Sequence, residues 1–186
     1  MRKDFNAQKV TEDIINWIRE YFHKQPGAKG AVIGISGGKD STVTAKLLVD
    51  ALGRDRVLGV LMPNGEQKDI KDSLKLVDFI GIPYKIVNIE KAYNGLIEAI
   101  ADENLSEDAK INMAPRLRMT TLYAIAANMH YRVCGTGNKS EAFVGYTTKW
   151  GDSAYDFNPI GNLTTEEVMA VGDYLGLPYE LVHKTP

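Results

Sequence analysis

Six residues between a short apolar run and a helical pattern carry the chemistry that this chain can be expected to perform. The apolar run covers residues 31–35, and Ser-Gly-Gly-Lys-Asp-Ser follows it directly at residues 36–41. The two glycines let the main chain approach an anion closely, because no Cβ atom intervenes. The serine hydroxyls can donate hydrogen bonds to phosphate, and the carboxylate of Asp40 can hold a divalent cation against it. The segment therefore predicts a phosphate-binding loop with a metal ion.

The sequence on either side of the loop supports this prediction. Residues 31–35 read as a buried parallel strand, and residues 42–52 carry apolar side chains at helical spacing. The N–H groups at a helix N-terminus and the positive end of its dipole favour bound phosphate. The loop is not a Walker A motif, because Asp40 follows Lys39 where that motif has Ser or Thr. An ordinary strand-to-helix turn is the alternative, but a turn alone does not need an aspartate between glycines and a serine.

The rest of the chain alternates helical and strand patterns. Apolar residues recur at helical spacing over residues 6–24, 42–52, 68–80, 92–101, 106–131 and 164–175. Short apolar runs predict strands over residues 31–35, 56–62, 84–89 and 131–136. Strands separated by helices predict an α/β fold, a doubly wound parallel sheet of about five strands in a single domain over residues 1–186.

Two groups of polar residues should meet at one edge of this sheet. The glycine loop follows the first predicted strand, and Gly-Thr-Gly-Asn at residues 135–138 follows the fourth. Ligands of doubly wound sheets bind at the carboxyl ends of the strands. We therefore expect Ser36 and Thr136 to face the same crevice.

Two of the predicted helices carry features with structural consequences. If Asn112 caps the long helix, Pro115 lies in its first turn, where the missing N–H costs little. The first helix is expected to expose Trp17, Tyr21 and Phe22. These rings and the apolar character of the long helix favour an interface with a second copy, although both helices could instead simply cover the sheet.

Composition and charge limit the function classes. The 186 residues are 44% hydrophobic and 25% charged, and a net charge of −2 without a basic cluster argues against a nucleic-acid partner. The N-terminus has no apolar leader pattern and no 18-residue apolar stretch occurs, so no membrane partner is expected. The single cysteine, Cys134, excludes an intrachain disulfide framework and is expected to be a small buried hydrophobe. A cytoplasmic location follows as an expectation.

The loop at residues 36–41 resembles the pyrophosphate-binding loop of the N-type ATP pyrophosphatases. These enzymes cleave ATP between its α and β phosphates and activate a substrate by adenylation. Further segments are similar to motifs of one family in this superfamily, the ammonia-dependent NAD synthetases; for example, Gly-Thr-Gly-Asn-Lys-Ser-Glu resembles the family's Gly-Thr-x-Asn-x-x-Glu. The matching segments are residues 112–119, 135–141, 145–152 and 156–159, with a looser match at 62–69.

This resemblance implies a ligase of NAD biosynthesis. The reaction would amidate deamido-NAD (nicotinate adenine dinucleotide) with free ammonia through an adenylated intermediate, with ATP as co-substrate and Mg²⁺ as metal, and would release AMP and pyrophosphate. Members of the family are homodimers that bind the dinucleotide across their interface, so a homodimer is expected. The family also continues past a Lys-x-Pro like that at residues 184–186 into a segment that covers the active site, which this chain is expected to lack.

The resemblance also implies roles for individual residues, none of them a covalent nucleophile. The metal ligands would be Asp40 and Glu141, and the substrate would be bound by Arg116, Lys149 and Asp156. Arg116 offers a planar fork for an anionic or polar group. The residues implied in ATP binding are Gly34, Ile35, Ser36, Gly37, Gly38, Lys39, Asp40, Ser41, Thr136 and Thr165.

Several residues near these positions have a structural interpretation instead. Arg118 and Lys139 are set aside as solvated charges, and Asp152 can be a turn residue after a glycine. Outside its motif, Glu141 would read as an ordinary surface carboxylate at a helix start. The histidines have no acidic or hydroxyl partner at motif spacing and are expected to be structural: His23, His130 and His183.

Two other functions stay open. One is another N-type ATP pyrophosphatase, for sulfur or amide transfer; sulfur transfer usually needs paired cysteines, which a single cysteine fits poorly. A nucleotide-binding module without turnover is favoured by Thr165, which stands where the family often has a lysine, and by the expected lack of the covering segment. Asp40 and Glu141, which such a module would not need, argue against it.

Overall fold

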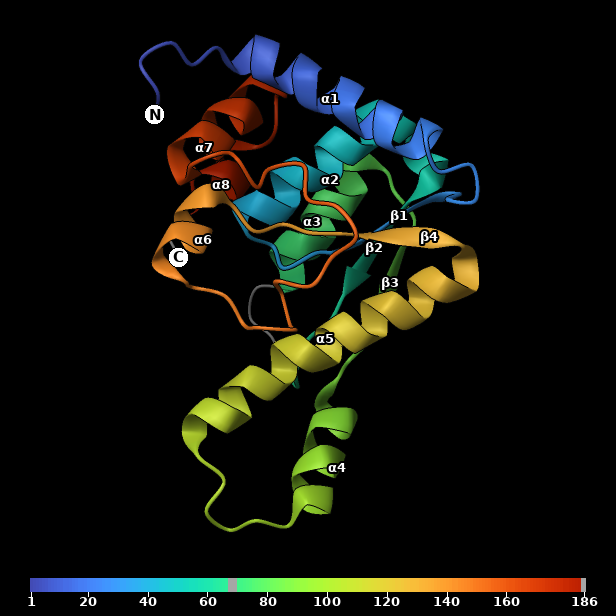
Figure 1. Cartoon of the computed structure of the whole chain (residues 1–186), viewed down its shortest axis with the longest axis vertical. Coiled ribbons are helices and arrows are strands. Elements are labelled where there is room, and N and C mark those ends of the chain that lie inside the picture. The colour runs from blue at the N-terminus through green and yellow to red at the C-terminus, as the bar shows by residue number, and fades with distance from the viewer. Residues whose placement is uncertain (67–69, 185–186) are drawn as a thin grey trace.

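The computed structural model describes residues 1–66 and 70–184. Its four strands form one parallel sheet in the order β3-β2-β1-β4: β1 (Gly30–Gly34), β2 (Val57–Leu61), β3 (Tyr84–Ile86) and β4 (Tyr131–Cys134). The helices are α1 (Ala7–His23), α2 (Lys39–Leu52), α3 (Ile70–Ile80), α4 (Glu90–Ile100), α5 (Glu107–Met129), α6 (Lys139–Val144), α7 (Thr165–Tyr174) and α8 (Tyr179–Val182), and a short 3-10 helix, η1 (Arg54–Arg56), precedes β2. The α/β class and the parallel sheet are therefore confirmed (Figure 1).

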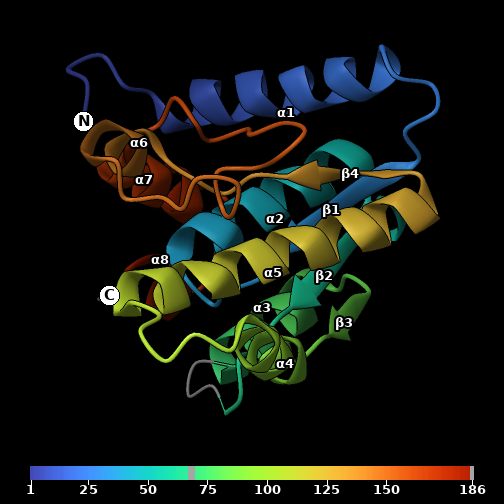
Figure 2. The same cartoon turned by 60° about the horizontal axis from the view of Figure 1, so that its bottom comes forward.

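The sheet is covered by helices on both faces. One core packs α1, α2, α3, α7 and α8 against the sheet, and a second, smaller core lies under α5, which crosses the opposite face (Figure 2). Side chains of β1 alternate between the two, because Ala31 and Ile33 belong to the first core and Val32 to the second. Burial on both faces explains why β1 is apolar throughout its length.

The prediction of about five strands is wrong by one. The third strand ends at Ile86, three residues earlier than predicted, and the chain enters α4 at Glu90. After β4 the chain returns to the sheet edge only as an isolated bridge between Cys134 and Phe157. A single bridge lacks the successive paired residues that make a strand. The short helix α8 was not predicted, and α6 was indicated only by the reading of Glu141 as a carboxylate at a helix start. The predicted helix start at residue 68 lies outside the described residues.

The predicted cap of the long helix is also wrong. The Ser106 side chain accepts a hydrogen bond from the Ala109 N–H and caps α5, so Asn112 and Pro115 both lie inside the helix. Proline there removes one helical hydrogen bond. The chain around Gly151 crosses the helix at this point, and a Cβ atom added to Gly151 would lie 2.9 Å from the Cβ of Pro115. Pro115 thus marks the place where α5 meets the loop that follows α6.

The first helix exposes fewer of its rings than predicted. Phe22 is only 5% exposed, because α1 packs on α2 and α7, and the expectation that it is exposed is wrong. Tyr21 stacks on Phe157 with ring centroids 4.7 Å apart, while Trp17 is 44% exposed. Within the described residues, no helix is long and apolar enough to span a membrane.

A buried carboxylate fixes the start of α7. Glu167 is 1% exposed and forms a capping box with Thr164, whose N–H donates to Glu167 at 3.1 Å. The Arg2 backbone and side chain also donate to this carboxylate. Burial alone would raise the pKa of Glu167, but the hydrogen bonds and the charge of Arg2 lower it to about 2.

We predict that Glu167→Gln lowers the free energy of unfolding at pH 7 by at most about 3 kcal/mol, the equivalent of this pKa shift. A carboxylate with a lowered pKa stabilises the fold above its unfolded pKa, and this stabilisation is lost as the pH falls from about 5 to about 2. The variant should therefore lose less stability than the unsubstituted protein over that range in urea titrations. Glu166→Gln, an exposed neighbour, is the matched control, and equal acid sensitivity of both variants would contradict the assignment.

Candidate functional site

The glycine loop between β1 and α2 is held in shape by its own serines. The Ser36 Oγ accepts a hydrogen bond from the Gly38 N–H at 3.2 Å, and the Ser41 Oγ donates one to the Gly38 carbonyl at 3.0 Å. Gly37 has a φ of +80°, in the left-handed region that favours glycine. Gly38 caps α2 without a side-chain hydrogen bond, so the first N–H groups of the helix are left for an anion.

Two carboxylates face each other across the crevice between β1 and β4, and Asn138 connects them. The Asn138 side-chain amide donates to Asp40 Oδ1 at 3.0 Å, and the Asn138 N–H donates to Glu141 Oε2 at 3.0 Å. Asn138 is 2% exposed and caps α6, which carries Glu141. The ammonium group of Lys39 lies 3.3 Å from Asp40 Oδ2. The predicted pairing of Asp40 with Glu141 at one site is therefore reproduced by the fold.

The surroundings of Glu141 disfavour its charge. Burial raises the pKa of Glu141, and the negative charges of Asp40 and Asp152 act in the same direction, partly opposed by the Asn138 N–H and by Lys39. A divalent cation between the carboxylates would relieve this repulsion.

The donor set fits magnesium bound together with phosphate. Mg²⁺ takes oxygen ligands and usually binds through one or two carboxylates plus substrate phosphates and water. Asp40 and Glu141 supply such a pair beside the glycine loop. Across residues 1–66 and 70–184, no cluster of three or more His, Cys, Asp or Glu side chains could hold a metal without further ligands. The site therefore suits a metal that arrives with a phosphate-bearing substrate.

Two cavities adjoin at the carboxyl edge of the sheet. A polar cavity of about 270 Å³ lies between the glycine loop, α6 and the chain that follows α6, and Asp40 and Glu141 line it. A more apolar cavity of about 330 Å³ lies between the ends of β1 and β4, Met62 and α5. Three residues line both: Ser36, Thr136 and Asp152. A ligand with an apolar ring system at one end and phosphates at the other could occupy both cavities.

The structure brings most of the predicted ATP-binding residues to these cavities, but Gly37, Lys39 and Thr165 line neither of them. Gly34 and Ile35 line the apolar cavity, and Gly38 and Ser41 line the polar one. Lys39 lines neither cavity and pairs with Asp40 instead. Thr165 begins α7 and is held by α6, because its N–H donates to the Ser140 Oγ at 3.2 Å.

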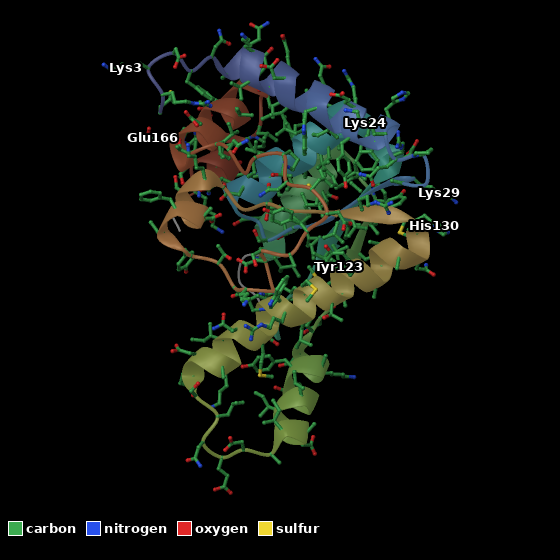
Figure 3. All side chains as sticks on the ribbon, in the orientation of Figure 1. Lys3, Lys24, Lys29, Tyr123, His130 and Glu166 are labelled. Carbon is green, nitrogen blue, oxygen red and sulfur yellow. The ribbon has the colours of Figure 1, made fainter. Side chains whose placement is uncertain are left out.

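The three predicted substrate residues lie outside both cavities. Arg116 is exposed and donates from Nε to the Lys149 carbonyl at 3.2 Å. The Lys149 ammonium group lies 5.7 Å from the centroid of the Trp150 ring. Asp156 accepts hydrogen bonds from the Val133 N–H at 2.8 Å and from the hydroxyl of Tyr123, a residue of α5 labelled in Figure 3. These residues tie the chain around 149–156 to α5 and β4.

Two residues that the sequence analysis set aside line the cavities. Arg118 lines the apolar cavity and donates from Nε to the Met62 carbonyl at 3.0 Å, so it is not a solvated charge. Its spacing gave a usable signal, because it comes four residues before Leu122 and shares that residue's side of the helix. Asp152 accepts the Thr148 N–H as a turn residue would, yet it also lines both cavities.

The assumption that the histidines have no acidic partner is wrong for His183. Its Nε2 lies 2.8 Å from Asp173 Oδ1, and its ring stacks on Tyr179. The partner is ten residues away and becomes adjacent only because α8 folds back on α7. Cys134 is buried, as predicted, and burial raises the pKa of its thiol well above the usual value.

Comparison with known proteins identifies the family. Residues 10–186 match the NAD synthase family. The chain belongs to this family. This member of the NAD synthase family is 40% identical over 185 residues to the NH(3)-dependent NAD(+) synthetase of Carboxydothermus hydrogenoformans, an alignment that covers 97% of this chain and 75% of that relative.

Solved structures agree with the family assignment. The NH3-dependent NAD synthetase from Campylobacter jejuni superposes with a TM-score of 0.90 at 36% identity, over 97% of this chain and 78% of that one. The NMN synthetase from Francisella tularensis superposes with a TM-score of 0.89 at 35% identity, over 98% of this chain and 76% of that one. The parallel sheet flanked by helices is thus the architecture of NAD synthetases.

We predict that Mg²⁺ binding in the presence of pyrophosphate weakens as the pH falls. The affinity should begin to fall at a higher pH than it would for two carboxylates with ordinary pKa values. The reason is that the raised pKa of Glu141 makes it take up a proton early, and a protonated carboxyl is a poor ligand. Isothermal titration calorimetry between about pH 5 and pH 7.5 measures this. Glu141→Gln should bind about tenfold or more weakly at the upper end and lose this pH dependence.

The matched control is Glu98→Gln, an exposed carboxylate on α4. The protonation of pyrophosphate itself affects this variant in the same way. Its Mg²⁺ affinity should therefore vary with pH as in the unsubstituted protein. Unchanged affinity together with an unchanged pH profile in Glu141→Gln would show that Glu141 is not a ligand.

Proposed function

We propose that the two adjoining cavities form the active site of an ATP-dependent ligase that amidates deamido-NAD with ammonia, giving NAD, AMP and pyrophosphate. Membership of the NAD synthase family supports this activity, as do relatives named NH(3)-dependent NAD(+) synthetase. The single observation that carries the site assignment is the pair Asp40 and Glu141, connected by Asn138 beside an uncapped helix start.

ATP is assigned across both cavities. Its nucleoside part would occupy the apolar cavity, next to Gly34 and Ile35. Its phosphates would lie on the glycine loop in the polar cavity, which also carries the two carboxylates for magnesium. The residues assigned to ATP are Gly34, Ile35, Ser36, Gly37, Gly38, Lys39, Asp40, Ser41 and Thr136, with Thr165 as an outer residue that acts through α6.

The reaction needs two bond exchanges. An oxygen of the nicotinate carboxylate attacks the α-phosphorus of ATP, a new P–O bond forms, and pyrophosphate leaves with the electron pair of the broken bond. Ammonia then attacks the carbonyl carbon, AMP leaves, and the nitrogen loses a proton. Magnesium would neutralise charge on the departing pyrophosphate. Asp40 and Glu141 would hold that cation, and the N–H groups of the loop would hold the phosphates in line.

Deamido-NAD is assigned to Arg116, Lys149 and Asp156. All three lie where the chain that follows α6 contacts α5 or β4, next to the wall of the apolar cavity. Their cation and carboxylate groups suit the pyrophosphate and ribose groups of a dinucleotide. This assignment rests on the family's motif positions as well as on the contacts.

Two rival functions receive less support. Sulfur transfer needs an accessible thiolate, whereas Cys134 is buried and its pKa is raised. A module without turnover would not need Asp40 and Glu141 connected by the buried Asn138. The similarity to an NMN synthetase makes nicotinate mononucleotide an alternative acceptor of the amide nitrogen, and the assay below includes it.

We predict that the protein forms NAD from deamido-NAD, ATP, magnesium and ammonium, and that Asp40→Asn lowers kcat about a hundredfold or more. The substitution keeps size and most hydrogen bonding but removes the charge that holds the cation, which is worth several kcal/mol in the transition state. Chromatographic measurement of NAD, AMP and pyrophosphate in equal amounts tests the reaction.

Asp50→Asn is the matched control, because Asp50 lies at the other end of α2 and pairs with Lys46. It should keep the turnover of the unsubstituted protein. Turnover with nicotinate mononucleotide but not with deamido-NAD would show that the substrate is nicotinate mononucleotide instead of deamido-NAD. No amide product from either would overturn the proposed function.

We also propose that the protein is a homodimer. Apolar side chains are exposed on β3, α4 and the start of α5: Tyr84, Ile86, Leu96, Ile100 and Ile111, each between 40% and 66% exposed. In Figure 1, α4 and the first half of α5 project from the body of the molecule. A monomer rarely exposes this much clustered apolar surface.

We predict that sedimentation equilibrium at micromolar concentration gives twice the mass of one chain. The double variant Leu96→Glu and Ile100→Glu should sediment as a monomer, because it places two charges on this apolar surface of α4. Phe79→Glu, an exposed apolar residue of α3, should leave the dimer intact. A monomeric mass for the unsubstituted protein would contradict the proposal.

A further inference from the structure

The side chains that line the two cavities are almost all neutral or negative. Three carboxylates line them: Asp40, Glu141 and Asp152. Among the described lining residues, Arg118 is the one cation. The proposed ligands, ATP and the carboxylate of the second substrate, add further negative charge. A fixed positive charge in this place therefore has a large electrostatic effect.

Arg118 is held in the cavity wall by a single backbone contact. Its Nε donates to the Met62 carbonyl at 3.0 Å, and its side chain is partly buried. No carboxylate in the described part of the chain forms an ion pair with it. Burial disfavours the charged form of its guanidinium group and lowers its pKa. A partly buried cation without a counter-charge costs free energy unless a ligand supplies the anion.

The position of Arg118 indicates which anionic group of a ligand could bind it. Arg118 lines the apolar cavity, and Ser36 and Thr136 line both this cavity and the polar one. A nucleotide with its nucleoside part in the apolar cavity would place the phosphate joined to its ribose near the shared residues, in the cavity that Arg118 also lines. With Nε already bound to Met62, the terminal nitrogens of the fork are the donors left for that phosphate.

We propose that Arg118 contacts the α-phosphate of ATP and stabilises it while the substrate carboxylate attacks. This inference rests on the proposed function. In this step the carboxylate oxygen forms a bond to the α-phosphorus, and the bond from that phosphorus to the bridging oxygen of pyrophosphate breaks. Negative charge concentrates on the α-phosphoryl oxygens as two anions approach each other, and the guanidinium group offsets it. Arg118 is then a catalytic residue, whereas Arg116, two residues earlier on α5, belongs to the outer contacts.

Isotope exchange between pyrophosphate and ATP, measured with deamido-NAD but without ammonia, isolates the adenylation step. We expect Arg118→Met, which keeps an apolar stem, to slow this exchange about a hundredfold or more. Arg118→Lys keeps the positive charge but loses the planar fork of the guanidinium group. Its exchange rate should therefore lie between those of the unsubstituted protein and Arg118→Met. Adding guanidinium to Arg118→Ala should restore part of the exchange, because the truncation leaves space in an existing cavity.

A second readout separates contact with the phosphate from a structural effect. The two diastereomers of ATP with sulfur at the α-phosphate place sulfur on different non-bridging oxygens. We expect the ratio of their exchange rates to change about tenfold or more in Arg118→Met. Arg56→Met is the matched control, because Arg56 also donates from Nε to a main-chain carbonyl but lies at the opposite edge of the sheet.

The outcomes distinguish this inference from the proposed function. Exchange within threefold of the unsubstituted protein in folded Arg118→Met, or slow exchange with an unchanged diastereomer ratio, would overturn the role of Arg118 and leave the proposed function standing. If the unsubstituted protein forms no amide product, the proposed function fails, and this inference fails with it.

Discussion

Two carboxylates at the carboxyl edge of the sheet are held together by one buried asparagine. Asn138 donates from its side chain to Asp40 and from its backbone to Glu141, and its Oδ1 accepts the N–H groups of Ser140 and Glu141. Asp40 lies in the first turn of α2, the helix after β1, whereas Glu141 lies on α6, the helix after β4. The asparagine therefore joins the two loops of the crevice and offsets part of the repulsion between the carboxylates. The strand order makes this possible, since β1 and β4 are neighbours although far apart in the chain.

The second half of the crevice depends on a close approach of α5 to the chain that follows α6. Pro115 meets Gly151, Asn112 accepts the hydroxyl of Thr148, and Arg116 donates to the Lys149 carbonyl. One side of the same helix turns Arg118 toward the cavity and the end of β2. These contacts form one wall of the apolar cavity from α5 and the chain that follows α6. The sheet and the glycine loop form other parts of the site.

Charge is distributed unevenly over the site, and this distribution is consistent with its proposed chemistry. The polar cavity carries carboxylates that suit a cation arriving with phosphate, and the raised pKa of Glu141 reflects burial together with the neighbouring negative charges. The apolar cavity carries the guanidinium group of Arg118. Figure 3 shows Lys29 and His130 near the amino ends of β1 and β4, away from Glu166 at the start of α7, so these basic side chains belong to the other edge of the sheet.

The sequence by itself determined the features that depend on neighbours along the chain. The apolar run at β1, the glycine loop, the helix that follows it and the α/β class were all predictable, because strand period, glycine conformation and helix spacing are local. The meeting of the loops at Ser36 and Thr136 could be expected from the two strand ends, whereas the pairing of Asp40 with Glu141 was implied only by the family motif. Tertiary structure decided the rest: that β3 stops at Ile86, that Phe22 is buried, and that the side of α5 carrying Arg118 faces a cavity. Each of these depends on what packs against the element from a distant part of the chain, and neither spacing nor propensity records that contact.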